Sequence, residues 1–296
     1  MQAALTPAQQ AAQQKRKADR RQVTLLIGPP TLWLLIFFML PLVVILVISF
    51  LTRDTYGGIR PDFNPTNYSQ LLDVNVFIVF ANSVWLAVLT TIACLLVGYP
   101  MAYFIAHQPQ PWRNVCVLLV IIPFWTNFLV RTYAIMLLLR DQGVINSALL
   151  SLGIINTPLT MLYTPFAVFV GEFYGFLPFM VLPLYVAIEK FDFSLMEAAH
   201  DAGANIAHAF MRIMVPLTMP GIVAGSILVF IPAIGAFVTP IVLGGAKVLL
   251  IGNLIDREYH TARNWPLASA MSISLMVLVS IATAIYFRTT TEQDRL

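Results

Sequence analysis

Six long runs of apolar residues dominate the pattern of the chain, and each run is long enough for a helix that crosses a membrane. A bilayer core about 30 Å thick needs roughly 20 apolar helical residues, because each residue adds about 1.5 Å. The runs cover residues 24–51, 76–106, 115–139, 163–188, 217–239 and 267–287. We therefore predict an all-α membrane protein with about six transmembrane helices.

Prolines interrupt two of these runs. Pro178 and Pro183 lie in the fourth run, and Pro232 lies in the fifth. Because proline removes a backbone hydrogen bond, we predict kinks at these positions. Kinked helices are tolerated in a membrane where they line a cavity or pack against other helices.

The composition agrees with a membrane protein and excludes several other classes. Of the 296 residues, 59% are hydrophobic and only 10% are charged, against about 25% charged residues in ordinary globular domains. These proportions exclude a soluble enzyme, a secreted disulfide scaffold and a disordered chain. The formal net charge of +3 is small, so nothing indicates a nucleic-acid-binding surface.

Basic residues indicate the orientation. With six spans both termini lie on one side, where ten Lys and Arg residues then fall, against six on the other side. Cytoplasmic segments carry the excess of basic residues, so we predict cytoplasmic termini. Residues 1–23 supply five of the ten, and we expect this basic tail to be disordered, in loose contact with the anionic inner leaflet. The transmembrane domain is expected at 24–288, with a short cytoplasmic tail at 289–296.

The long cytoplasmic loop at about residues 189–216 has the pattern of a compact helical knob. Ser194 is a predicted N-cap with Glu197 as its capping-box partner, and Gly203 can end the helix in a left-handed turn. Glu197 and Asp201 are four residues apart and therefore share one face of this helix. A knob of this shape is suited to being gripped by a cytosolic partner.

The same loop carries a spaced motif. Glu197-Ala198-Ala199 is followed after three residues by Gly203, and after nine more by Ile213, with Val215-Pro216 behind it. This spacing resembles the EAA loop, E-A-A-x3-G-x9-I-x-L-P, of ATP-binding-cassette (ABC) importer permeases, with Val215 in place of Leu as the departure. The resemblance implies that the loop docks into a groove on a separate ATPase subunit and transmits its opening and closing. The residues that it assigns to this ATPase-coupling loop are Glu197, Ala198, Ala199, Asp201, Gly203 and Pro216.

Further segments of the chain are similar to the spermidine/putrescine permeases of that family. They lie at residues 123–133, 141–146, 177–185, 244–247, 251–253 and 264–266, and the likeness runs from about residue 24 to 287. It implies the type I importer fold and the first, B-like, of two permease subunits in a polyamine importer of the bacterial inner (plasma) membrane.

The same resemblance implies a set of partners. These are a second permease subunit, two cytoplasmic ATPase subunits that bind ATP and magnesium, and a periplasmic or extracellular substrate-binding protein. No cofactor is expected in this chain itself. A permease for another small organic cation or organic solute stays open as the alternative.

Two ionisable residues, Arg131 and Glu172, lie within the predicted spans. Each costs about 2.5 kcal/mol or more at the bilayer centre unless it has a partner or a wet cavity. Each lies nine residues from the outer end of its run, so at about 1.5 Å per residue we predict a shared depth of roughly 13–14 Å below the outer surface. They could form a structural ion pair, Glu172 could face the substrate path and attract a polycation, or one of them could reach the outer interface.

Aromatic residues near these charges are candidates for contacting an ammonium group. Trp125, Tyr133 and Tyr174 could hold it by cation–π contact, or could simply pack against other helices. Some polyamine permeases of the family carry an acidic residue in the fifth span, but residues 235–239 have none, which moves a cation site to Glu172 or to the partner subunit. The candidate substrate path therefore comprises Glu172, Arg131, Trp125, Tyr133 and Tyr174.

The sequence lacks common enzyme motifs. It has no G-x-x-x-x-G-K-[ST] loop for ATP phosphates, no H-E-x-x-H metal motif and no G-x-S-x-G nucleophile motif. We therefore expect no catalytic residue and no metal site, and energy supplied by another polypeptide. A secondary transporter is the second hypothesis. It would need several membrane carboxylates or a repeated pattern of broken helices, whereas we find one membrane carboxylate and no repeat.

Overall fold

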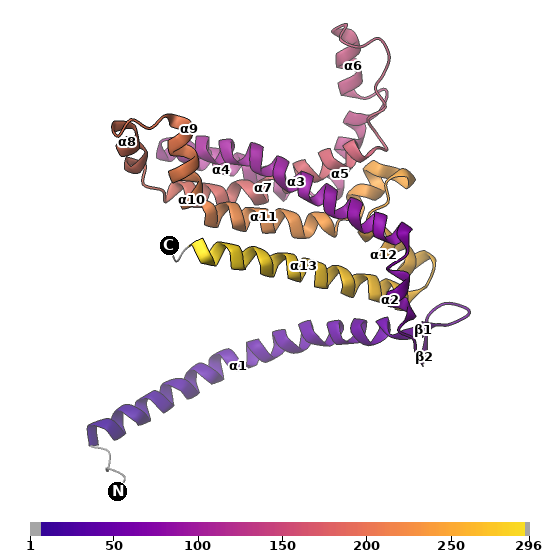
Figure 1. The fold of residues 1–296 in the computed structure, drawn as a ribbon, viewed down its shortest axis with the longest axis horizontal. Coiled ribbons are helices and arrows are strands. Elements are labelled where there is room, and N and C mark those ends of the chain that lie inside the picture. Colours follow the sequence, from indigo (N-terminus) through magenta and orange to yellow (C-terminus); the bar gives the residue numbers. More distant parts are fainter. Residues whose placement is uncertain (1–6, 294–296) are drawn as a thin grey trace.

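A computed structural model describes the backbone of residues 7–293 and the side chains of residues 26–245 and 247–284. Four helices in this part of the chain are long and apolar enough to cross a membrane, with up to six crossings if each of two bent helix pairs counts as one. The four are α1 (Pro7–Ser49), α3 (Val74–Ala106), α7 (Pro165–Glu189) and α13 (Trp265–Gln293). This architecture confirms the all-α prediction (Figure 1).

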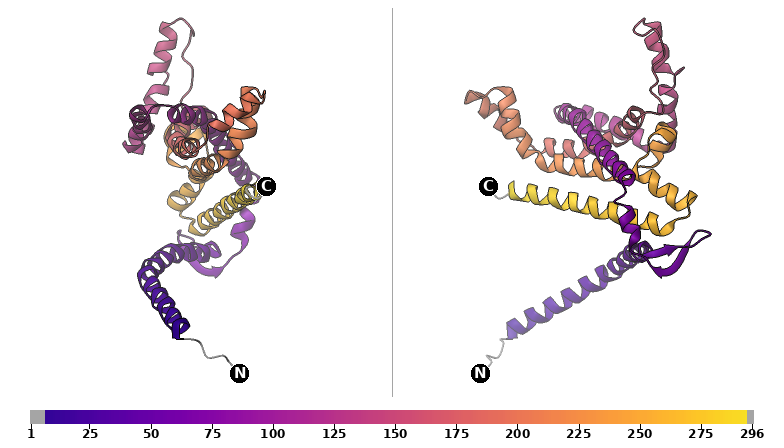
Figure 2. Two further views of the ribbon diagram at one scale, coloured as in Figure 1. Left: turned by 90° about the vertical axis from the view of Figure 1, so that its left-hand side faces the viewer. Right: turned by 45° about the vertical axis from the view of Figure 1, so that its right-hand side comes forward.

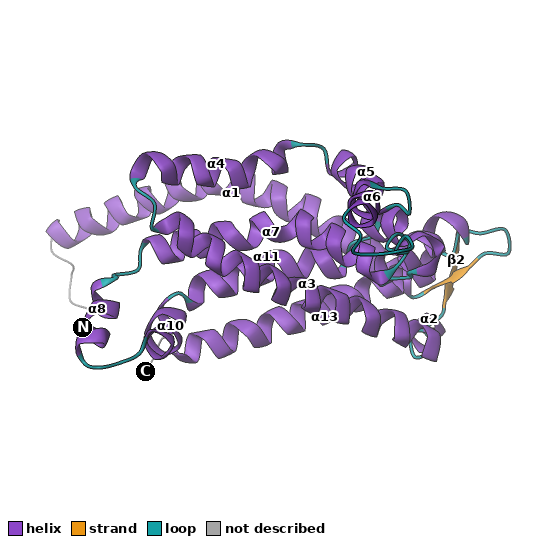
Figure 3. Ribbon diagram, turned by 90° about the horizontal axis from the view of Figure 1, so that it is seen from above, coloured by secondary structure: helices purple, strands orange, loops and turns teal. Residues whose placement is uncertain are grey.

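The centre of the bundle consists of α3, α7 and α11 (Met219–Ile234), which lie side by side (Figures 1 and 3). Met180 and Leu184 of α7 are fully buried there. Gly221 of α11 allows the helices to come close, because a Cβ atom at this position would lie only 2.9 Å from the carbonyl oxygen of Pro183. Small residues at a helix interface are a common means of close packing in membranes, and here they bring α11 against α7.

The first helix, α1, lies apart from this centre. It meets α13 near its C-terminal end and diverges from the bundle towards its N-terminus (Figures 1 and 2). Large apolar side chains along it, such as Trp33, Phe37 and Leu40, are exposed. In the membrane these side chains need a cover of lipid or of another subunit.

The basic segment before the first span is helical from Pro7 onward, where disorder was predicted for residues 1–23. Helix α1 begins at Pro7. Ala, Gln, Lys and Arg, which are frequent in this segment, are good helix formers, and the segment extends a helix that the apolar run already nucleates. At the other end α13 continues to Gln293. Residues 1–6 and 294–296 lie outside the described residues.

The third apolar run is not one continuous helix, which corrects the helix predicted over 115–139. The run is divided into α4 (Gln110–Trp125) and α5 (Phe128–Leu139), and the stretch Phe128–Ser151 lies at 91° to α4. Thr126 is extended, and Asn127 starts α5 because its side chain accepts a hydrogen bond from the backbone N–H of Leu129 (2.8 Å). After α5 the chain forms α6 (Val144–Ser151).

The fifth run is bent by 69° at Thr218. Before the bend lie α9 (Ile206–Ala209), the π-helical turn η1 (Phe210–Met214) and α10 (Val215–Leu217). The helix predicted over 217–239 is therefore shortened to the 16 residues of α11, because the chain leaves the helix at Thr218 and again at Gly235, and α11 qualifies as a crossing only together with Ile206–Leu217. In contrast, the prolines of the fourth run lie inside α7 without dividing it.

Short elements occupy the two ends of the bundle (Figure 2). At one end, the hairpin of β1 (Leu51–Arg53) and β2 (Ile59–Phe63) precedes α2 (Thr66–Gln70) and is an addition to the all-helical prediction. The Arg53 guanidinium donates to the carbonyl oxygen of Ala262 (2.6 Å), which ties this hairpin to the segment before α13. That segment comprises η2 (Pro240–Gly244), η3 (Gly245–Lys247), α12 (Ile251–Asp256) and η4 (Arg257–Thr261). Helix α8 (Ser194–Asp201) projects at the opposite end.

Candidate functional site

Helix α8 forms the centre of the predicted coupling loop, and a local cap starts it. The Asp192 carboxylate accepts a hydrogen bond from the backbone N–H of Ser194 (3.0 Å), and hydrogen bonds from Ser194 hold the pKa of this carboxyl below its ordinary value. Ser194 is the first residue of the helix and does not act as its N-cap, so the predicted Ser194–Glu197 capping box is wrong. Asp192 replaces it because a carboxylate two residues upstream already satisfies the free N–H group.

Gly203 ends α8 in a left-handed turn, as predicted. Its φ is +85°. Two backbone hydrogen bonds close the turn, from Gly203 N–H to the His200 carbonyl (2.8 Å) and from Ala204 N–H to the Ala199 carbonyl (2.9 Å). This is the Schellman arrangement, which glycine adopts without steric strain.

The predicted coupling residues lie on one exposed unit, residues 192–217, which we call the coupling knob. Its return helix consists of α9, η1 and α10. Asn205 caps the start of this helix, because its side chain accepts a hydrogen bond from the backbone N–H of His208 (2.7 Å). Ala199 is half-buried. The exposed residues of the prediction are Glu197, Ala198, Asp201 and Gly203 on the α8 side, and Pro216 on the return helix. The structure thus brings the motif to the surface at the end of the bundle that is predicted to be cytoplasmic (Figure 1).

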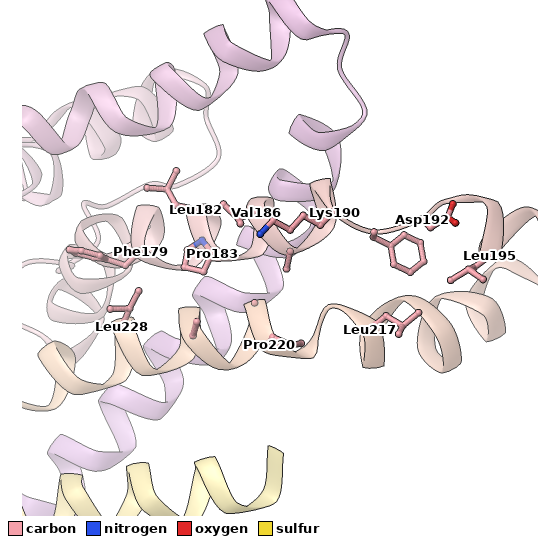
Figure 4. A pocket seen from close by; sticks show the side chains of 14 residues that line it. Phe179, Leu182, Pro183, Val186, Lys190, Asp192, Leu195, Leu217, Pro220 and Leu228 are labelled. Carbon is pink, nitrogen blue, oxygen red and sulfur yellow. The ribbon is translucent and has the colours of Figure 1, made fainter. Parts of the chain in front are cut away.

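A groove of about 790 Å³ lies beside the coupling knob, between α7 and α11 (Figure 4). Its walls are mainly apolar, and Lys190 and Asp192 supply its charged groups. Leu195 and Leu217 extend the groove onto the knob. No local sequence pattern marks this groove, because its walls come from helices that are distant in sequence.

Glu172 is enclosed between α3 and α7. Its side chain is 1% exposed. The Thr90 hydroxyl donates a hydrogen bond to Oε2 of Glu172 (3.4 Å), whereas Oε1 has no hydrogen-bond partner. No ion pair joins Glu172 to Arg131. Of the three arrangements predicted for these two charges, the ion pair is therefore not formed.

Arg131 lies in the first turn of α5, against aromatic rings. Its guanidinium carbon is 5.4 Å from the ring centroid of Phe124 and 5.8 Å from that of Phe128, within reach of cation–π attraction. The shared depth of Arg131 and Glu172 stays a prediction. Arg131 lines a cavity with Tyr174, which is two residues beyond Glu172 on α7.

A cavity of about 340 Å³ between α3, α4 and α7 brings Arg131 together with Tyr174. Glu172 does not line this cavity. Trp125, at the end of α4, is 77% exposed, and Tyr133, on α5, is 50% exposed. Of the five residues predicted for the substrate path, two therefore share a cavity, two present open aromatic rings, and Glu172 is enclosed elsewhere.

Comparisons with known proteins place the chain among transport proteins. No protein-family model matches it. It is 46% identical over 249 residues to the spermidine/putrescine transport system permease protein PotB of Salmonella typhimurium, covering 84% of this chain and 87% of that protein. Identity to PotB of Escherichia coli (strain K12) is 45%, covering 84% and 90%. The inner membrane ABC transporter permease protein YdcU of Escherichia coli is 32% identical over 243 residues, covering 78% and 74%.

Solved structures share the fold. A chain of a bacterial ABC transporter involved in the import of the acidic polysaccharide alginate matches with a TM-score of 0.76 at 17% identity, covering 95% of this chain and 99% of that chain. A second structure, of an alginate ABC transporter in complex with alginate pentasaccharide-bound periplasmic protein, matches with a TM-score of 0.71 at 19% identity, covering 92% and 94%. At these identities the likeness concerns the fold alone.

The fold is that of a type I ABC importer transmembrane domain. The chain belongs to the family of the PotB permease proteins of ABC transporters. It is therefore a multi-pass inner-membrane subunit that catalyses no reaction and carries no cofactor, since ATP is bound by the ATPase subunit of such transporters. The class that the coupling motif predicted is confirmed.

Proposed function

We propose that this chain forms one half of a translocation pathway for the polyamines spermidine and putrescine. The observation that carries the proposal is the 45% and 46% identity, over 84% of the chain, to PotB proteins named for spermidine/putrescine transport. A second permease subunit completes the pathway, two cytoplasmic ATPase subunits dock below it, and a periplasmic binding protein delivers the substrate.

The coupling knob receives the movement of the ATPase subunits. Helix α8 is capped at its start by Asp192 and at its end by the turn at Gly203, so a partner can displace it as a unit. Its exposed residues include two carboxylates, Glu197 and Asp201, one helical turn apart. When ATP closes the ATPase dimer the knobs move together and the pathway opens outward. After hydrolysis the pathway opens inward and releases the substrate.

For the substrate path we assign the exposed rings of Trp125, Tyr133 and Tyr174. An ammonium group over the face of such a ring gains about 0.5–2 kcal/mol. Arg131 lies beside Tyr174 and repels a polycation, so it belongs to the boundary of the path. Glu172 is enclosed and contacts the substrate only in a conformation in which α3 and α7 separate.

The test uses the reconstituted complex of this chain, its partner permease, the ATPase and the binding protein. We expect the binding protein to stimulate ATP hydrolysis only when it is loaded with spermidine or putrescine. Stimulation by another solute and by neither polyamine would refute the substrate assignment and leave the permease class intact. Failure to co-purify with an ATPase would refute the coupling role.

A further inference from the structure

We infer that α3 is a strut that carries the movement of the coupling knob into the membrane, with Tyr99, Tyr103 and His107 as its positioning residues. The inference rests on the proposed coupling function and names the residues that transmit it. The three side chains follow one another at four-residue intervals, so they share one face at the end of α3. This face meets both the start and the end of the knob.

Tyr103 and His107 hold the start of the knob. Phe193, directly before α8, packs edge-on against both rings, with its centroid 4.4 Å from that of His107 and 6.3 Å from that of Tyr103. His107 is itself fixed, because its Nδ1 hydrogen-bonds the carbonyl oxygen of Tyr103 (2.8 Å). A displacement of Phe193 therefore pushes on the end of α3.

Tyr99 holds the end of the knob. Its ring packs edge-on against Phe210 at 5.3 Å, and its hydroxyl lies 2.9 Å from the hydroxyl of Thr218. Thr218 is fully buried at the 69° bend between α10 and α11. Because the Thr218 hydroxyl donates to the carbonyl of Met214 (2.8 Å), the Tyr99 hydroxyl is the donor in the bond that they share. The bend is therefore attached to α3.

Helix α3 continues from these contacts to the opposite end of the molecule. It has 33 residues, a length of about 50 Å. Along it the Thr90 hydroxyl donates to Glu172 of α7, and near its far end the Ser83 hydroxyl accepts a hydrogen bond from the backbone N–H of Ile251 (2.8 Å), the first residue of α12. One continuous helix thus connects the coupling knob to α12, at the opposite end of the bundle, without an intervening loop.

Arg113 connects the turn after α3 to the end of α7, directly before the coupling knob. The Arg113 guanidinium pairs with Glu189, the last residue of α7 (2.9 Å), and also donates to the carbonyl of Ala106 at the end of α3 (3.0 Å). A partly exposed pair of this kind contributes little to stability. Its position keeps the ends of α3 and α7 together where the knob begins.

The hydrogen bond between Tyr99 and Thr218 gives the sharpest test. Tyr99→Phe and Thr218→Val each remove one of its hydroxyls and keep the shape of the side chain. In the reconstituted complex we expect each variant to transport about fivefold less polyamine per ATP hydrolysed, while still co-purifying with the ATPase and hydrolysing ATP. The double variant should lose no more than Thr218→Val alone, because both changes remove the same bond and only Thr218→Val also removes the bond to Met214.

Two matched controls accompany these variants. Thr218→Ser keeps the hydroxyl, and Tyr259→Phe removes a tyrosine hydroxyl from η4, at the other end of the bundle. Both should match the parent chain in transport per ATP. Loss of transport in Thr218→Ser as large as in Thr218→Val would show that transport depends on the packing of this side chain and not on its hydroxyl, and would overturn the inference.

Normal transport per ATP in both single variants would also overturn the proposal that α3 transmits the movement of the coupling knob. So would a parallel loss of transport and of co-purification, because Tyr99 would then serve only to stabilise the fold. If polyamine-loaded binding protein fails to stimulate the parent complex, the proposed substrate is wrong. The amount of solute transported per ATP hydrolysed is then measured with the solute that does stimulate the complex. Failure of the strut and failure of the proposed function are thus told apart.

Discussion

The two bent helices of this permease are built in opposite ways. At the bend between α4 and α5, the contacts are local and exposed: Asn127 caps α5, and the Thr126 hydroxyl donates to the carbonyl of Pro123 (2.7 Å). At the 69° bend the pivot is the buried Thr218, and the residue that holds it, Tyr99, lies 119 positions away in sequence. The bend between α4 and α5 is held by neighbouring residues, whereas the bend at Thr218 is held by a residue of a distant helix in the core.

This difference separates two roles. A bend with local caps keeps its shape by itself and leaves its outer side chains for lipid or for another subunit. A bend that is bonded to a distant helix moves with that helix. The buried bend therefore suits the transmission of movement from the coupling knob, and the exposed bend suits the presentation of Trp125 and Tyr133.

The largest effect is expected where the buried bend leads into the core. Gly221→Ala places a Cβ atom 2.9 Å from the carbonyl oxygen of Pro183, so we expect a loss of about 1–3 kcal/mol in stability and a clearly lower melting temperature of the purified protein. Gly235→Ala is the matched control, because its Cβ would meet only the Ile231 carbonyl, at 3.9 Å. Equal melting temperatures for the two variants would contradict the close α7–α11 packing.

The next effect concerns the coupling knob. Gly203→Asp should leave the protein inserted in the membrane but lower polyamine transport by roughly tenfold or more, a cost of about 1.4 kcal/mol or more, because it adds a charge beside Asp201 at the docking turn. Gly203→Asn is the matched control, since Asn has a similar size, tolerates φ +85° and adds no charge. Normal transport by the Asp variant would refute the docking role of the turn.

A smaller effect is expected at the enclosed carboxyl. Glu172→Gln keeps the shape and a hydrogen-bond acceptor for Thr90, so uptake should stay within about twofold of that of the parent chain. Because no ion pair joins Glu172 to Arg131, adding Arg131→Gln should not restore any lost uptake. Restoration by the double variant, measured as polyamine uptake into vesicles, would show that the two residues do pair in the working transporter.

The smallest effect on transport is expected at the exposed bend. Asn127→Ala removes the cap of α5 and should cost about 1 kcal/mol of stability, whereas Asn127→Asp keeps a side-chain acceptor and should cost less. Transport per ATP should remain that of the parent chain in both variants, unlike in Thr218→Val. Uncoupling by Asn127→Ala would remove the distinction between the two bends.

Local patterns in the sequence predicted the features that depend on local physics. Long apolar runs predicted α3, α7 and α13, because the hydropathy of a span is a property of consecutive residues. Gly203 predicted the end of α8, because the left-handed turn depends on a single residue. The spacing of the coupling motif predicted the class of protein.

Features that depend on distant contacts or on direction were not predicted. Prolines marked expected kinks, yet Pro178 and Pro183 lie inside an undivided α7, while the chain bends at Thr126 and Thr218. Apolar residues on both sides of each bend hide it from a hydropathy pattern. Nor does the sequence pair Tyr99 with Thr218.

Thiol cross-linking at the tip of the coupling knob tests the central claim most directly. Ala198 is exposed on α8, whereas Cys94 is buried and Cys116 lies within α4, so the parent chain serves as the control. In the assembled complex, Ala198→Cys should form an adduct with lysine amines of the ATPase subunit through a short reagent that joins a thiol to an amine, with a yield that changes when ATP is added. Full reactivity of this cysteine towards a water-soluble thiol reagent, without any adduct to the ATPase, would contradict the account.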